Sequence, residues 1–333
     1  MGIRKNQAIL TAAERNAFVA AVKALKASGA YDTFVDQHLT AFMSSPNDPA
    51  HGGPAFLPWH REYLARFERA LQAVDPTVSL PYWDWTVDNS QSASLWDSAF
   101  MGGNGSGGNG QVTTGPFAFS TGKWTLTVLD SGETRNYLRR EFGVMGRLPT
   151  PTDVQTAIGV VPYDLAPWNR NSDVNTSFRN HLERVIHNPG HMWTGGSMMN
   201  MSSPNDPVFW LHHCNIDRLW AVWQRAHPTR VYVPPSGTSG VVAGHSLDDP
   251  MPPWAQESSP PTPRKVLNHH MLGYRYDDEP LAFGATGIDA ALYSGAKCYF
   301  FKGDQYIRVT RGDTGPGTVD KGYPASISGW GWP

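Results

Sequence analysis

The histidines of this sequence constrain its fold more than any other feature. Seven of the 12 histidines form two sets along predicted helical stretches: His38, His51 and His60, and then His187, His191, His212 and His213. Histidines brought together from separate helices can hold a metal ion, and ligation by imidazole alone favours copper, zinc, iron or nickel. The chain has 2 cysteines, which excludes a site made of thiolates alone. The sequence therefore predicts helices that converge on a metal site. The spacing of the histidines does not decide which metal binds there.

One pair of these histidines raises a question about local structure. The segment HNPGH places a proline and a glycine between His187 and His191. Residues four apart share a helix face, but proline and glycine are the poorest formers of a helix interior. A proline is tolerated in the first turn of a helix, where its missing N–H loses no partner. We therefore expect one helix to end at His187 and the next turn to begin at His191, with a kink at Pro189 and both imidazoles facing one metal.

Apolar periodicity and capping signals predict a mainly helical chain with long loops. A capping box formed by Thr11 and Glu14 opens the first predicted helix, and Ser28-Gly29 ends it. Further helices are expected over 31–43, 59–74, 173–187 and 206–227. The glycine-rich stretch 101–110 is predicted to be a flexible surface loop, and the proline-rich residues 228–263 are also expected as loop.

Near residue 281 the pattern changes to that of β-strands. The segment KCYFFKGDQYIRVT alternates on both sides of a Lys-Gly-Asp turn, as a hairpin does. We place a domain boundary near Glu279 and Pro280, which gives a helical domain over 1–280 and a small β segment over 281–333.

Charge and hydropathy exclude some partners. The formal net charge is −2 and no basic run is present, so neither nucleic acid nor an anionic membrane is expected as a partner. No apolar stretch has the length of a membrane span. The first residues lack the apolar segment of a secretory signal. The chain is therefore expected in the cytoplasm, or exported without a signal peptide of its own.

Several motifs together carry a family resemblance. HGGPAFLPWHREYLARFERAL, LPYWDW, HNPGHMWTGGSM and SPNDPVFWLHHCNIDRLW resemble the tyrosinase family of type-3 dicopper proteins, and LGYRY at 272–276 resembles the tyrosine motif that closes its catalytic domain. The resemblance implies a four-helix-bundle core that holds two copper ions. It assigns His38, His51 and His60 to the first copper, Cu A, and His187, His191 and His213 to the second, Cu B. His212 is expected beside the ligands, because neighbours on a helix cannot point at one metal.

The resemblance also implies a pair of residues that acts on monophenols. Family members that hydroxylate monophenols are thought to use a glutamate and an asparagine to hold a basic water. Glu183 and Asn188 match these positions. The alternative is structural: Glu183 pairs with Arg179, four residues earlier, and Asn188 caps the helix.

Asp217 follows His213 by four residues on the same predicted helix. We expect it to accept a hydrogen bond from a ligand imidazole and so to fix its tautomer. A salt bridge to Arg61 or Arg218 is the alternative.

The C-terminal segment from Ile288 resembles one hemopexin-like repeat, which forms a single blade of a β-propeller. One blade cannot bury its own faces. Three interpretations stay open: further repeats in a longer protein, self-association with blades of other chains, or a lid over the catalytic entrance. The lid could place a tyrosine in the entrance, and the candidates are Tyr293, Tyr299, Tyr306 and Tyr323.

By this resemblance the protein oxidises phenols, o-diphenols or o-aminophenols with O2 to o-quinones, as in pigment formation. Monophenol hydroxylation and diphenol-only catechol oxidation both stay open. The alternative class is an O2-binding protein of the hemocyanin type, which needs a bulky residue over the copper. Met198, Met199 and Met201 are expected at the entrance. A copper-delivery or carrier protein is considered as a further partner.

Overall fold

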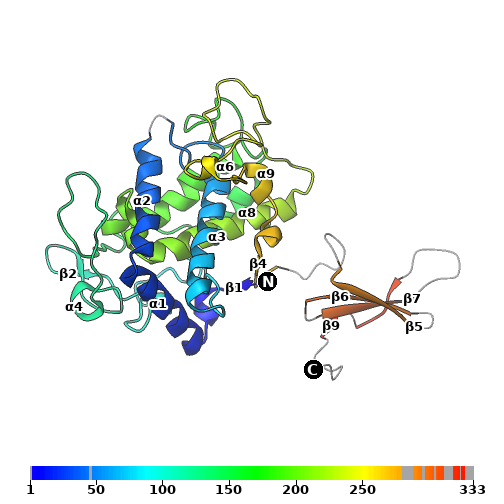
Figure 1. Cartoon of the computed structure of the whole chain (residues 1–333), viewed down its shortest axis with the longest axis horizontal. Coiled ribbons are helices and arrows are strands. Elements are labelled where there is room, and N and C mark those ends of the chain that lie inside the picture. Colours follow the sequence, from blue (N-terminus) through cyan, green and yellow to red (C-terminus); the bar gives the residue numbers. More distant parts are fainter. Residues whose placement is uncertain are drawn as a thin grey trace. The chain divides into compact units, whose positions relative to one another are not determined.

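The structure is a computed structural model that describes residues 2–44, 47–279, 288–294, 297–303, 305–310, 318–322 and 324–326. The chain forms two compact units, Met1–Asp277 and Asp278–Pro333 (Figure 1). Within the described ranges no helix is both long enough and apolar enough to cross a membrane.

The first unit is built mainly of helices. The long ones are α1 (Ala12–Ala27), α2 (Ala30–Met43), α3 (Phe56–Val74) and α8 (Val208–Ala226). The shorter ones are α4 (Phe119–Gly122), α5 (Pro151–Gly159), α6 (Phe178–His181), the π-helical segment η3 (Leu182–His187), α7 (Asn188–Thr194) and α9 (Pro263–Val266). The predicted capping box is confirmed at the start of α1. The expected helix over 173–187 is present from Phe178, but half of it is π-helical, which the apolar pattern did not indicate.

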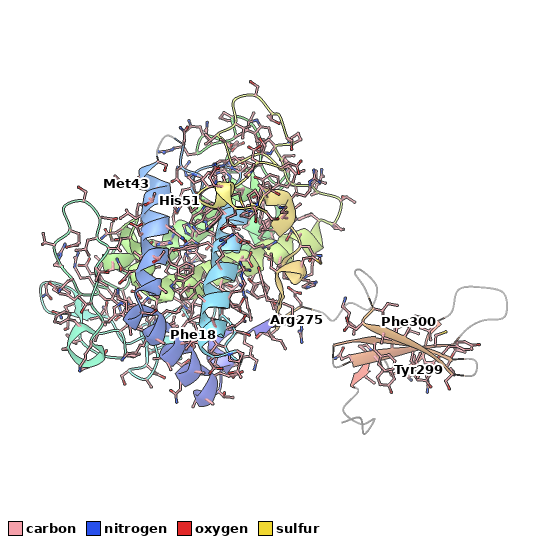
Figure 2. The ribbon with its side chains drawn as sticks, viewed as in Figure 1. Phe18, Met43, His51, Arg275, Tyr299 and Phe300 are labelled. Carbon is pink, nitrogen blue, oxygen red and sulfur yellow. The ribbon has the colours of Figure 1, made fainter. Side chains whose placement is uncertain are left out.

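Aromatic side chains hold α2, α3 and α8 together. The rings of Phe67 on α3 and Trp210 on α8 stack with centroids 3.6 Å apart. The hydroxyl of Tyr63 on α3 donates to the carbonyl of Phe34 on α2 at 2.6 Å, and α2 and α3 run side by side in Figure 1. Phe18, labelled on α1 in Figure 2, is also buried. The large aromatic content therefore serves mainly as a rigid core between the helices.

A buried ion network joins the two ends of the first unit. Strand β1 (Gly2–Arg4) pairs in parallel with β4 (Tyr274–Tyr276), which is part of the LGYRY motif. The buried guanidinium of Arg4 pairs with Glu68 at 2.8 Å and lies 3.4 Å from the centroid of the Tyr274 ring. A buried arginine is tolerated here because both its charge and its hydrogen bonds are met.

Asp217 belongs to this network, and the hydrogen bond expected between it and a ligand imidazole is not found among the described residues. Its carboxylate accepts from Arg61 Nε at 2.5 Å and from the hydroxyls of Tyr274 at 2.6 Å and Tyr276 at 2.5 Å. Arg4 donates to the same carboxylate at 3.4 Å. The oxygens expected to accept a hydrogen bond from a histidine are thus surrounded by two arginines and two tyrosines. The salt bridge to Arg61 is therefore the confirmed alternative.

The glycine-rich stretch 101–110 is exposed at the surface over 106–109, as predicted, but strand pairing and close packing hold the rest of it, so the prediction of a flexible loop was wrong there. Strand β2 (Gly105–Ser106) pairs with β3 (Gln111–Val112). A Cβ on Gly105 would lie 2.0 Å from the carbonyl oxygen of Gly110 and 2.4 Å from that of Arg140. Arg140 in turn forms a buried ion pair with Asp206 at 2.7 Å. Glycine serves here for close backbone approach, a use that composition cannot distinguish from flexibility.

The second unit contains an antiparallel sheet. Its strands are β5 (Ala290–Ser294), β6 (Lys297–Lys302), β7 (Gln305–Thr310), β8 (Thr318–Val319) and β9 (Ala325–Ser326), in the order β5-β6-β7-β8, with β9 also paired to β7. The predicted hairpin is the β6–β7 pair. Figure 2 labels Tyr299 and Phe300 on β6, and every described residue of β6 and β7 is partly exposed. Tyr323 lies outside the described residues.

The first prediction concerns the ion network. Asp217→Asn should lower the free energy of unfolding by about 3–5 kcal/mol, because it leaves buried arginine charge undercompensated. Urea denaturation of the copper-free protein, followed by circular dichroism, measures this. Asp153→Asn removes the acid of a surface ion pair with Arg147 and serves as the control, with little change expected. Equal losses in the two variants would contradict the structural importance of the network.

Candidate metal centre

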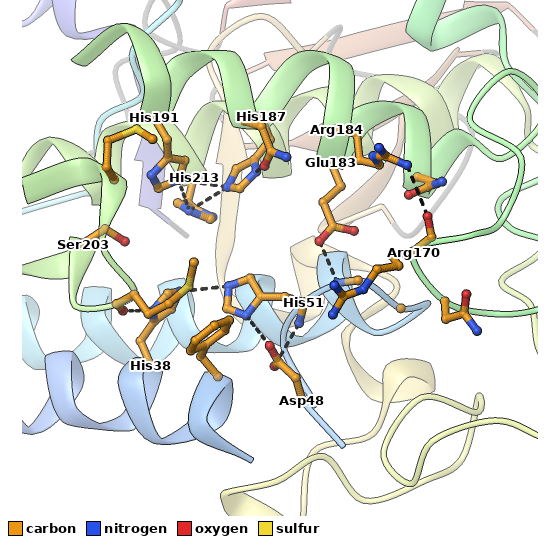
Figure 3. A pocket seen from close by; sticks show the side chains of 18 of the residues that line it. His38, Asp48, His51, Arg170, Glu183, Arg184, His187, His191, Ser203 and His213 are labelled. Atoms are coloured by element: carbon orange, nitrogen blue, oxygen red, sulfur yellow. Dashed lines mark hydrogen bonds and ion pairs between the residues drawn. The ribbon is translucent and has the colours of Figure 1, made fainter. Parts of the chain in front are cut away.

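The six histidines expected as ligands converge in two groups of three. In each group one ring nitrogen of every histidine lies within 4.8 Å of the others. Nε2 of His38 lies 3.2 Å from that of His51, and Nε2 of His187 lies 3.0 Å from that of His191 and 3.2 Å from that of His213. The rings of His60 and His213 stack with centroids 4.4 Å apart, so the two groups adjoin. Figure 3 labels five of the six histidines, with His38 and His51 facing the second group across a cavity.

The helix type changes after His187, where the sequence predicted a helix to end. The next helix begins directly at Asn188 and not at His191, and the helical backbone is unbroken between them. His187 ends η3, Asn188 begins α7, and Pro189 lies in the first turn of α7. Gly190 is needed for a different reason: a Cβ at this position would lie 2.3 Å from Cε1 of His212. The proline therefore opens the helix, and the glycine lets α7 approach α8 closely enough to bring the histidines together.

Five of the six imidazoles are oriented by an acceptor at Nδ1. These bonds are 2.7–3.0 Å long and join His38 to Met201 O, His51 to Asp48 Oδ2, His60 to Phe56 O, His187 to Asn188 Oδ1 and His191 to Met198 O. A proton held at Nδ1 leaves the lone pair of Nε2 free for a metal. Nε2 of His60 is buried and has no hydrogen-bond partner within the described part of the chain. This donor set fits metal ions bound by Nε2.

Burial keeps five of these imidazoles neutral. Desolvation lowers the pKa of His38, His60, His187 and His213 well below the ordinary value of 6.5. It also lowers the pKa of His191 to about 4. In every case the neighbouring imidazoles lower it further. Neutral imidazole is the form that binds a metal.

Two supporting residues were missed in the sequence. Among the described residues, Asp48 is the one carboxylate that accepts from Nδ1 of these histidines, and it also accepts from the backbone N–H of His51 at 3.1 Å. His245 lies between two backbone groups: its Nδ1 accepts from Ala55 N at 3.1 Å, and its Nε2 donates to Asp48 O at 3.0 Å. The spacing of Asp48, three residues before His51, was the available signal. His245 had none, because it reaches this loop from the proline-rich segment.

His212 lies beside the centre, as predicted. Its Nδ1 accepts a hydrogen bond from Nε1 of Trp85 at 3.0 Å, and its ring stacks on that of His187 with centroids 5.1 Å apart. The ring of the neighbouring His213 packs against that of Phe209, with centroids 4.0 Å apart. Phe209 precedes His213 by one helical turn and was not singled out from the sequence.

Glu183 and Asn188 both line the cavity that borders the histidines. The volume of this cavity is about 650 Å³. Glu183 pairs with Arg179 at 3.1 Å, as the structural alternative predicted, and its other oxygen accepts from Gly52 N at 2.7 Å. Asn188 does not cap a helix with its side chain but accepts from His187 Nδ1. Both residues thus border the site, and both are held by neighbours.

Comparison with known proteins decides the family. The family model for the common central domain of tyrosinase matches residues 28–226. The chain is 50% identical to a tyrosinase of Streptomyces glaucescens, over 84% of this chain and 100% of that protein. It is 42% identical to the grixazone synthase of Streptomyces griseus, over 83% of this chain and 99% of that one. The chain belongs to the tyrosinase family.

Solved structures with the same helical fold include enzymes and oxygen carriers. A polyphenol oxidase of Thermothelomyces thermophila is 27% identical, with a TM-score of 0.55 over 72% of this chain and 73% of that one. A hemocyanin of Rapana thomasiana is 23% identical, with a TM-score of 0.54 over 83% and 69%; it shares the fold alone. The hemopexin family model matches residues 288–333.

Membership of the tyrosinase family makes this protein a copper-dependent phenol oxidase with a type-3 pair of copper ions. The enzymes at about half identity over most of the chain support this activity more directly than the hemocyanin fold supports oxygen carriage. Two histidine triads are the number that such a pair requires.

The second prediction concerns acid pH. The copper-free protein should lose stability as the pH falls from about 6.5 toward 4, because protons bind the unfolded histidines before they bind the buried ones. Urea midpoints measured across this range test it. A double variant, His60→Gln with His213→Gln, should show a shallower decline. A decline of the same slope in both proteins would contradict the inference that the lowered pKa values of these histidines cause the loss of stability.

Proposed function

We propose that His38, His51 and His60 hold Cu A and that His187, His191 and His213 hold Cu B. The observation that carries this proposal is the convergence of the Nε2 atoms, while acceptors hold Nδ1 in five of the six rings. When bound, the copper pair supplies the redox chemistry with O2. The catalytic domain is then residues 1–280, a four-helix bundle of α2, α3, α8 and the η3–α7 segment, and residues 281–333 form a single hemopexin-like blade.

The cavity supports substrate turnover rather than oxygen carriage. It borders five of the six proposed ligands and has space for a substituted phenol. The phenyl ring of Phe209 packs among the histidines, but it is fully buried in α8 and does not line this cavity. We infer that o-diphenols and o-aminophenols reach the copper pair through this opening and leave as quinones or quinone imines.

Glu183 and Asn188 are proposed to hold the water that accepts the proton of a monophenol. The amide oxygen of Asn188 meets His187, which leaves its NH2 group as a donor toward the cavity. Each oxygen of Glu183 has one partner, so each keeps an acceptor site. If the pair is structural, the enzyme is a diphenol-only catechol oxidase.

The third prediction tests the ligand assignment. Metal analysis of the loaded protein should find two copper ions per chain. His213→Ala should abolish catechol oxidation and lower the copper content. His212→Ala, the matched change at the neighbouring residue, should keep part of both, because its Nδ1 meets Trp85. Equal effects on copper content would overturn the distinction.

The fourth prediction separates monophenol from diphenol chemistry. Glu183→Gln should depress monophenol turnover more than diphenol turnover, since a diphenol is more acidic and needs the base less. Asn188→Asp retains the acceptor for His187 but loses the amide donor, so it should have the same effect. Asn171→Asp, on the wall of the same cavity, is the control and should leave the ratio of the two rates unchanged. Equal losses on both substrates would refute the assignment.

A copper-delivery protein is proposed as a partner because methionines line the cavity wall. Met192, Met198, Met199 and Met201 contribute to it, and thioethers suit Cu(I). Slower copper uptake from a Cu(I) donor after Met199→Ala would support delivery by this route, and unchanged uptake would contradict it.

Self-association through the blade is proposed from its exposure. The side chains of β6 and β7 are partly exposed along their whole length, and a single blade needs neighbours to bury its faces. Sedimentation velocity of the full chain tests this. A monomer at every concentration would exclude it.

A further inference from the structure

Two arginines line the copper cavity without an acidic partner. Arg184 follows Glu183 in η3, and Arg170 lies in the loop before α6; both side chains are exposed on the cavity wall. Arg184 Nη1 donates to the carbonyl oxygen of Arg170 at 3.3 Å. Within the described ranges neither guanidinium forms an ion pair, although most arginines of this unit do. Two guanidinium groups thus remain available to a ligand.

The acidic groups of the same cavity are already engaged. Glu183 is bonded to Arg179 and to the backbone N–H of Gly52. Asp48 is bonded to His51. Glu183 therefore has a cationic partner and Asp48 has two hydrogen-bond donors, whereas the two arginines have no acidic partner in the described ranges. Bound copper would add positive charge to the same cavity.

The loop that carries Arg170 is built with a strained backbone. Trp168, which lines the cavity, has φ of 61°, a left-handed conformation that is costly for a bulky residue. Such strain persists where surrounding contacts impose it, and it gathers at ligand sites. Here the carbonyl oxygen of the next residue, Asn169, accepts a hydrogen bond from Arg179 Nη2 at 3.0 Å, and Arg179 is paired with buried Asp164 at 2.8 Å.

The loop is also fixed against the ligand-bearing segment. A Cβ on Gly52, next to His51, would lie 3.8 Å from the Cβ of Arg170. Figure 3 shows Arg170 and Arg184 at the end of the cavity where Glu183 lies, with the guanidinium of Arg184 turned toward the backbone of Arg170. Both residues line the same cavity as five of the six histidines.

We propose that Arg170 and Arg184 bind a carboxylate on the substrate, so that this enzyme prefers phenols, o-diphenols or o-aminophenols that carry an anionic group. A guanidinium pairs with a carboxylate through two parallel hydrogen bonds, which fixes orientation as well as charge. Trp168 packs beside the aromatic ring of such a substrate. This inference rests on the proposed oxidation at the histidine site and adds a substrate class to it.

The test compares three o-diphenols that differ in charge: 3,4-dihydroxyphenylpropionate, neutral 4-methylcatechol and cationic dopamine. The readout is the ratio of kcat/KM for the acid to that for 4-methylcatechol, because the ratio cancels changes in copper loading. Arg184→Gln and Arg170→Gln should each lower this ratio by about five- to tenfold, mainly through KM. Arg184→Glu should shift the preference toward dopamine. Added salt should weaken the preference of the unaltered enzyme.

Arg147→Gln is the matched control, since this exposed arginine lies outside the cavity and pairs with Asp153; its ratio should equal that of the unaltered enzyme. Ratios unchanged within twofold in both glutamine variants would overturn the proposal and show that the arginines are solvated surface residues. Oxidation of 4-methylcatechol by the unaltered enzyme reports the proposed function separately. Its absence would refute that function, whereas its presence with unchanged ratios would refute the substrate class alone. Circular dichroism and copper content exclude misfolding as the cause of a lower ratio.

Discussion

The site depends on six imidazoles whose ring nitrogens lie close together inside the protein. Crowded Nε2 atoms repel one another through their lone pairs unless a cation lies between them, and burial prevents protons from filling this place. Every local feature nearby serves this arrangement. Acceptors fix the rings at Nδ1, Gly190 lets two helices approach, and aromatic rings keep water away from the buried side. The metal thus completes an arrangement that the helices have already prepared.

Much of this was predictable from short-range patterns. The capping box of α1, the helix boundary inside HNPGH and the six histidines all follow from residues a few positions apart or from motifs that stay contiguous in the sequence. The hairpin of the second unit followed from alternation around its turn. In each case the determining residues are local, so the sequence carries the signal directly.

The errors have a common physical origin in long-range contacts. Asp217 was expected to serve a histidine one turn away, but its partners include Arg61 and two tyrosines almost sixty residues downstream. The glycine-rich stretch was read as flexible because the backbone that packs against it, including Arg140, comes later in the chain. His245 supports the loop of His51 from nearly two hundred residues away. Local spacing cannot distinguish such partners from solvent.

The buried guanidinium of Arg4 has a consequence for how the protein is made. Its partners span from Glu68 on α3 to Tyr274 near the end of the first unit. The contacts of Arg4 therefore cannot be complete until the segment that carries Tyr274 has been synthesised. Contacts with such sequence separation form late, because they require a long loop to close. The β1–β4 pairing therefore forms late in folding and completes the ion network between α3 and α8, so the full stability of this helix pair depends on two strands that lie outside it.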